Sequence, residues 1–152
     1  MEVRTFSELI SWTRQLHEHL AIRLKQGSSQ NAGVRASALL QYLSEHEAHM
    51  ERLIREFEKQ ADPKAMKTYV YDYIAHKPIK RQHTADDHYA LLSFDEICRE
   101  VFDFHTQVIQ LYRVLMGKVD IPEVQALLEP LIEMEEHEAM QLSMQTGRMA
   151  DM

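Results

Sequence analysis

Histidine and glutamate are the residues of this 152-residue chain whose types and spacing could do chemistry. The chain has nine histidines and 24 acidic residues but a single cysteine, Cys98, which we expect to fill space on an apolar helix face. Imidazole and carboxylate groups together are typical ligands of divalent transition metals in proteins. Any such chemistry depends on which of these side chains the fold brings together.

Five polar residues fall on the apolar faces of predicted helices. Each residue turns a helix by about 100°, so residues three and four positions apart share a face. By this rule His17 and His105 lie about 40° from the centre of an apolar face. Three glutamates also fall within apolar arcs. The inward polar set is therefore His17, Glu47, His105, Glu135 and Glu138.

Two further histidines stand in the second predicted helix. His46 falls on the edge of the apolar arc, and Met50 takes on this helix the place that Glu138 takes on the fourth. His46 and His49, three residues apart, could form an exterior metal pair with Glu45. A solvated helix face explains the same pattern.

Apolar residues at spacings of three and four predict that the chain is all-α. Only four glycines and four prolines interrupt it, which favours long helices over turns. We expect a single domain, residues 1–152, with helices over about 7–25, 34–59, 93–116 and 121–146 and a long crossover over about 60–92. The short connections within each half predict a four-helix bundle of two antiparallel hairpins.

Capping residues and prolines set the predicted helix ends. Ser7 and Ser93 are expected N-caps of the first and third helices. Asp120 is expected to cap the fourth helix, with Pro122 near its first position. Pro130 lies inside that helix, where it removes a hydrogen bond and predicts a kink.

The two halves of the sequence repeat each other. A shift of 88 positions places His17 on His105 and Glu47 on Glu135 without a gap. Matched polar pairs of this kind indicate an internal duplication with pseudo-two-fold symmetry. A rival register with a three-residue slip would instead pair Glu47 with Glu138, and the ungapped register is preferred because it matches both hairpins.

The inward set also lies at one level. Within each hairpin the histidine and its glutamate are about equally far from the connecting turn, so all four side chains can meet. Buried carboxylates without partners are costly, so such a group must share protons, form ion pairs or hold cations. A divalent metal removes the repulsion between carboxylates and uses the neutral imidazoles as well.

The two hairpins, the long crossover and the pair Glu47-x-x-Met50 and Glu135-x-x-Glu138 resemble the ferritin-like superfamily. That resemblance implies metal ligands on all four helices, in a motif with Glu-x-x-His on the second and fourth helices. Here Met50 and Glu138 stand where the motif has histidines. His17 and His105 stand where it has single glutamates, so the ligand set is a permuted one.

Two hypotheses follow for function. In the first, the chain is a bundle that binds iron or manganese through the inward set, and the resemblance implies a dimetal oxidoreductase that uses dioxygen or peroxide. In the second, the chain is not an enzyme, each histidine is hydrogen-bonded to the glutamate beside it, and the bundle acts as an oligomeric interaction or structural protein. No phosphate-binding glycine loop or hydrolase elbow is present, so no organic cofactor is indicated.

Charge and hydropathy limit the partners. The net charge of −7 disfavours nucleic acid, which requires a basic surface. No apolar run approaches the roughly 18 residues of a membrane span, and the first residues do not resemble a secretory signal. We therefore expect a cytoplasmic protein that forms a homo-oligomer, such as a dimer. The methionine-rich C-terminal segment could form a dimer or partner contact, although ordinary filling of the core is the preferred explanation of these methionines.

Overall fold

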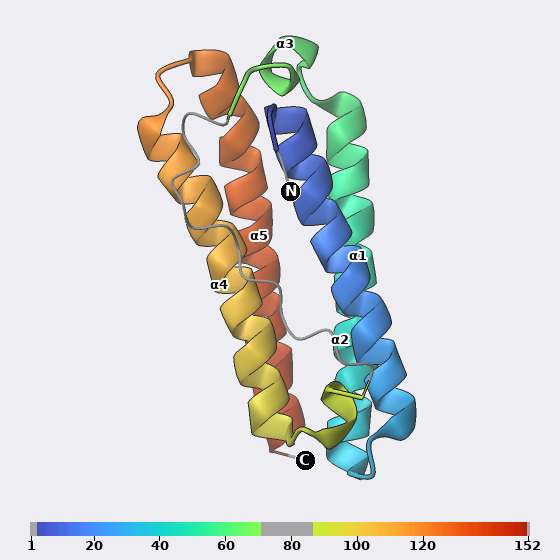
Figure 1. Cartoon of the computed structure of the whole chain (residues 1–152). Helices are drawn as coiled ribbons and strands as arrows, with labels where there is room; N and C mark the ends of the chain where they lie inside the picture. The colour runs from blue at the N-terminus through green and yellow to red at the C-terminus, as the bar shows by residue number, and fades with distance from the viewer. Residues whose placement is uncertain (1–2, 71–86, 152) are drawn as a thin grey trace.

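Four long helices form the structure, which is a computed structural model that describes residues 3–70 and 87–151 (Figure 1). The elements are α1 (Phe6–Gln30), α2 (Val34–Gln60), α3 (Pro63–Met66), the 3₁₀ helix η1 (Tyr89–Leu91), α4 (Phe94–Lys118) and α5 (Pro122–Ala150). Within the described ranges, β pairing is limited to an isolated bridge between Thr5 and Tyr69. The all-α prediction is therefore confirmed. No helix in these ranges is long and apolar enough to cross a membrane.

The helices are arranged as two hairpins (Figure 1). α1 and α2 form one hairpin, and α4 and α5 form the other. α2 and α4 run in the same direction, so α3 lies at one end of the bundle and η1 at the opposite end. Parallel neighbours require a connection as long as the bundle itself, which is the role of the predicted crossover. The middle of that crossover, with Tyr71 and Tyr73, lies outside the described residues.

The predicted apolar faces supply the core. Residues on the predicted inner faces of the helices are mostly buried. On the first helix all of them are buried: Phe6, Ile10, Thr13, His17, Leu20 and Leu24. On the other three helices, Phe57, Phe94, Cys98 and Glu138 are partly buried and Ile121 is exposed. The core therefore forms from the helix faces that the heptad-like spacing indicates.

Two of the three predicted N-caps are wrong. The N-cap of α1 is Thr5 rather than Ser7, because the Thr5 hydroxyl accepts a hydrogen bond from the backbone N–H of Glu8 at 3.2 Å. Ser93 does cap α4, in a reciprocal capping box with Glu96. Such a box satisfies two backbone N–H groups that the helix itself leaves without partners.

The start of α5 needs no side-chain cap. Ile121, not Asp120, is its N-cap residue, and Pro122 occupies the first turn as predicted. Proline is suited to this position because its backbone has no N–H to satisfy and its φ is already helical. α5 continues as one helix past Pro130, so the bend expected there stays a prediction.

α1 extends to Gln30, about one turn further than the glycine and serines near its end predict. The serines near this end do not form a turn. The hydroxyls of Ser28 and Ser29 donate hydrogen bonds to the carbonyls of Lys25 and Gln26 within the helix. Gly27 is buried, and a Cβ atom on it would lie 2.6 Å from the Cβ of Tyr89 in η1. This glycine therefore permits close packing of η1 on α1 rather than a turn.

A pair of glycine substitutions tests this interpretation. Gly27→Ala should destabilise the protein by about 1–3 kcal/mol, because the new methyl group collides with η1. Gly147→Ala should instead be neutral or stabilise α5 by up to about 1 kcal/mol, because nothing lies within 4 Å of its added Cβ. Urea unfolding of both variants measures the two effects. Equal changes in the free energy of unfolding of the two variants would show that Gly27 is not a packing contact.

Candidate metal centre

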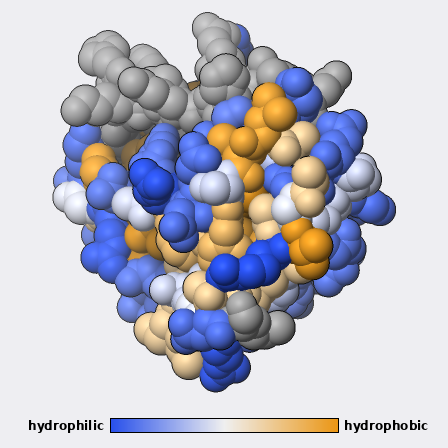
Figure 2. Space-filling view, turned by 90° about the horizontal axis from the view of Figure 1, so that it is seen from below, coloured by the Kyte–Doolittle hydropathy of each residue, from blue (hydrophilic) through white to orange (hydrophobic). Residues whose placement is uncertain are grey.

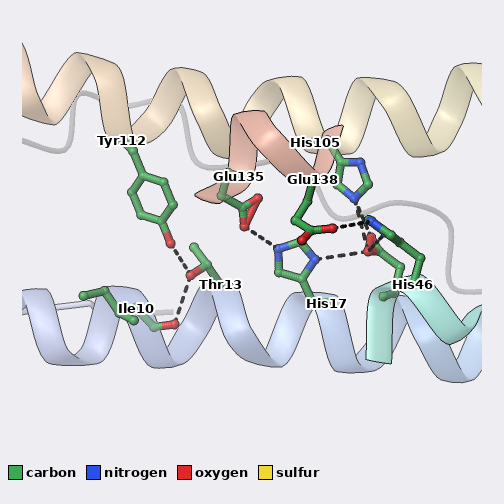
Figure 3. Close-up of polar contacts among 9 residues, drawn as sticks. Ile10, Thr13, His17, His46, His105, Tyr112, Glu135 and Glu138 are labelled. Atoms are coloured by element: carbon green, nitrogen blue, oxygen red, sulfur yellow. Dashed lines mark hydrogen bonds and ion pairs between the residues drawn. The ribbon is translucent and has the colours of Figure 1, made fainter. Parts of the chain in front are cut away.

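Four of the five predicted inward residues meet in the middle of the bundle. His17 comes from α1, Glu47 from α2, His105 from α4 and Glu135 from α5, and all four are buried. Figure 3 shows the imidazoles and carboxylates turned toward one another between the helices. The level and the inward phase that the sequence indicates are both confirmed.

The shortest contacts join residues of different hairpins. His17 Nε2 lies 2.8 Å from Glu135 Oε1, and His105 Nε2 lies 2.6 Å from Glu47 Oε1. The two pairs are related by the shift of 88 positions and use the same atoms, which supports the ungapped internal repeat. Each histidine is thus hydrogen-bonded to a buried glutamate, as the structural alternative expects, and that glutamate comes from the opposite hairpin.

Glu47 departs from the symmetry because it also contacts His17. Its Oε2 lies 3.4 Å from His17 Nδ1, and its two oxygens lie 2.6 and 3.1 Å from His105 Nε2. One nitrogen from each histidine and one Glu47 oxygen lie within 4.8 Å of one another. Two imidazoles and one carboxylate that converge in this way can hold a metal ion.

Glu138, the fifth predicted residue, does not join this trio. Its carboxylate is partly exposed and lies 3.2 Å from His46 Nε2 and 3.7 Å from His49 Nε2. His46 is buried, and its Nδ1 lies 3.8 Å from Glu47 Oε2, so its ring stands between Glu138 and the centre. Glu45, the predicted partner of the histidine pair, accepts a hydrogen bond from Gln41 instead.

Burial and charge act in opposite directions on the central groups. Burial alone would lower the pKa of His17, but the Glu135 and Glu47 carboxylates outweigh it and raise this pKa to about 10. Burial alone would raise the pKa of Glu47, yet His105 and His17 hold this pKa well below its usual range. Without a metal, the centre is therefore an imidazolium–carboxylate network. His46 follows the same pattern, because Glu47 and Glu138 overcome its burial and raise its pKa.

A buried hydroxyl pair beside the centre was not identified from the sequence. Thr13 donates a hydrogen bond to the carbonyl of Ile10 at 2.9 Å, and its oxygen is also bonded to the Tyr112 hydroxyl. Because a hydroxyl carries one hydrogen, the Tyr112 hydroxyl is the donor in that second bond. Burial, followed by the charge of Glu135, raises the pKa of Tyr112 and keeps it protonated. Both residues lie at core positions of the helical spacing. A hydroxyl group at a core position is the sequence feature that could have indicated this pair.

The donor set is suitable for a metal ion. Besides the converging trio, the buried Glu135 Oε2 has no hydrogen-bond partner among the described residues, although its Oε1 is bonded to His17. A buried carboxylate oxygen without a partner is costly, and a bound cation would remove that cost. The residues present therefore fit an ion held by two imidazoles and one carboxylate.

Comparison with known proteins identifies the fold. No protein family and no curated protein matches the sequence. A solved structure from Thermotoga maritima, described as a ferritin-like diiron-carboxylate protein, superposes on 93% of this chain and 94% of its own with a TM-score of 0.61. The sequences are 14% identical, so the similarity is one of fold. The chain has the ferritin-like fold that its two hairpins and long crossover predict.

Proposed function

We propose that this chain is an iron-binding protein whose metal ligands are His17, Glu47 and His105. The observation that carries the proposal is the convergence of their three ligand atoms within 4.8 Å in the core. Two histidines and one carboxylate with open positions are the donor set of non-haem iron(II) proteins. Manganese uses similar donors and is the second choice.

The contacts of each imidazole indicate which nitrogen would bind the ion. His17 Nε2 faces Glu135 at 2.8 Å, so a neutral His17 protonated at Nε2 donates to Glu135 and leaves the Nδ1 lone pair toward Glu47. His105 presents Nε2 to Glu47. Glu135 thereby acts as the carboxylate that fixes the tautomer and orientation of a metal-binding histidine.

The proposal extends to an oxidoreductase that uses dioxygen or peroxide. Bound iron would supply one-electron redox chemistry and open positions for such an oxidant. The buried trio excludes bulk water, and the proton that His17 would lose on metal binding is the one on Nδ1, which faces Glu47. This extension is supported by the donor set and by the fold shared with a diiron-carboxylate protein.

A structural network is the alternative function of the same residues. It is favoured by the position of His17, which as an imidazolium contacts both Glu47 and Glu135 and offsets part of their negative charge without a metal. In that case the bundle would act through its surface. Metal content and pH dependence distinguish the two hypotheses.

Elemental analysis of the untagged protein tests the metal site. After anaerobic loading with ferrous iron and desalting, the protein should retain about one iron per chain or more. His17→Ala and His105→Ala should each reduce iron affinity by about tenfold or more. His137→Ala, which removes an exposed histidine of α5, should retain iron as the parent does. A parent protein that takes up no metal contradicts the proposal.

The metal-free protein should be less stable at alkaline pH. The folded-state pKa of His17 is about 10, above its ordinary value of 6.5, so its stabilising contribution is complete below pH 6.5 and is lost toward pH 10. The lowered pKa of Glu47 adds stability that is lost as the pH falls below 4.5. Urea unfolding in the presence of a chelator should show a loss on the order of a few kcal/mol between pH 6.5 and pH 10.

His17→Gln should flatten that alkaline decrease, because glutamine does not titrate. Iron binding should show the opposite trend, since a ligand histidine must lose its proton and affinity therefore rises with pH. A metal-free protein whose stability is unchanged from pH 6.5 to pH 10 would show that His17 is not held as an imidazolium.

A further inference from the structure

A row of polar side chains connects the buried centre to solvent on one side of the bundle. The exposed fraction of these side chains rises outward, from 0% for Glu47 through 8% for His46 and 17% for Glu138 to 46% for His49. His46 and His49 come from α2, and Glu138 comes from α5. All are metal-ligand types, and none of the outer three belongs to the converging trio of the centre.

His46 contacts both an outer residue, Glu138, and a residue of the centre, Glu47. Its Nε2 lies 3.2 Å from Glu138 Oε2, and its Nδ1 lies 3.8 Å from Glu47 Oε2 (Figure 3). Nδ1 is buried and has no hydrogen-bond partner within residues 3–70 and 87–151. The His46 imidazole thus presents Nε2 to Glu138 and Nδ1 to Glu47, and Nδ1 is available to bind an ion.

The His46–Glu138 pair occurs in only one of the two repeated halves of the bundle. A shift of 88 positions places His46 on Met134 and Glu138 on Met50, so the equivalent positions of the other half hold two methionines. Met50 is buried, and Met134 packs against the core. Moving a cation through apolar side chains is costly, so the approach along His46 is the favourable one.

We propose that His46, His49 and Glu138 form an outer site that receives a divalent transition-metal ion from solvent and transfers it through His46 to Glu47. This inference rests on the proposed metal centre. Glu138 is the shared partner of the two outer histidines, at 3.2 and 3.7 Å, so its carboxylate would hold the ion between them. The ligand atoms of these three residues do not converge as closely as those of the central trio, so the half-exposed His49 ring would turn toward an arriving ion.

Timed loading with cobalt(II) tests the outer site separately from the centre. The protein is mixed with cobalt, quenched with excess chelator at increasing times, desalted and analysed for retained metal, which reports the buried ion. His49→Ala and Glu138→Gln should slow the filling of the centre by about tenfold, because each removes an outer ligand. Both should reach the same final cobalt content as the parent. His137→Ala, one position from Glu138 but exposed, is the matched control and should fill at the parent rate.

The possible outcomes separate this inference from the proposed function. If both variants fill at the rate of the His137→Ala control, the outer site plays no part in loading and the inference is wrong, while the metal centre stands. If the parent retains no cobalt after the chelator, the proposed function fails. Equilibrium dialysis without the chelator then decides for the outer site: weak cobalt binding that His49→Ala abolishes supports it, and binding unchanged by His49→Ala overturns it.

Figure 2 shows a different surface, with apolar side chains gathered at the end of the bundle where η1 lies. Val34 and Leu91 are the most exposed apolar residues there. Nothing in the structure indicates what would cover this surface, so no partner is assigned to it.

Discussion

The burial of the Glu47 carboxylate is the constraint on which the centre of the bundle depends. This group is fully removed from solvent and has contacts of 2.6 to 3.4 Å with imidazoles from α1 and α4. Removing one partner of a buried charge costs about 3–5 kcal/mol. The rotation of α1 and α4 about their axes is therefore tied to a charge on α2. Glu135 extends the same dependence to α5 through His17.

The internal repeat explains both the symmetry of the centre and the lack of symmetry around it. The two short His–Glu contacts join equivalent atoms of the two halves. This is expected if one hairpin was duplicated and the histidine of each copy pairs with the glutamate of the other. One shell further out the halves differ, with His46 and Glu138 on one side and methionines on the other. The histidine–glutamate pairs must be kept in the bundle centre, because a buried charge without a partner is costly. The residues around the centre can differ between the two halves. That divergence gives the site a polar side and an apolar side.

Helical phase and the lengths of the connections were sufficient to predict the fold and most of the centre. The buried positions of His17, Glu47, His105 and Glu135 follow from the 3.6-residue period, and their common level follows from their distance to the turns. His46 was predicted on the edge of its apolar arc and is buried, whereas Glu138 was predicted within its arc and is partly exposed. Their roles depend on how α2 and α5 pack, which a single helix pattern does not contain.

Which histidine contacts which glutamate was also beyond the sequence. The distances to the turns place all four residues at one level but do not choose among the possible pairs, and the closest carboxylate to each imidazole comes from the opposite hairpin. The extension of α1 past Gly27 has a similar origin, because η1, far away in the sequence, occupies the space that a side chain would need. In both cases the deciding contact joins distant segments, and local propensity carries no information about it.

In the proposed metal site, protons and metal ions would compete for the same nitrogen of His17. As an imidazolium, His17 offsets part of the negative charge of the two carboxylates that it contacts, so these residues have partners in the bundle before any ion binds. A zinc finger differs, because its ligands are assembled only when the metal binds. In this chain an incoming ion would exchange with a proton of His17 rather than order the chain. The affinity for that ion would then depend on the pH and on the carboxylates that stabilise the proton.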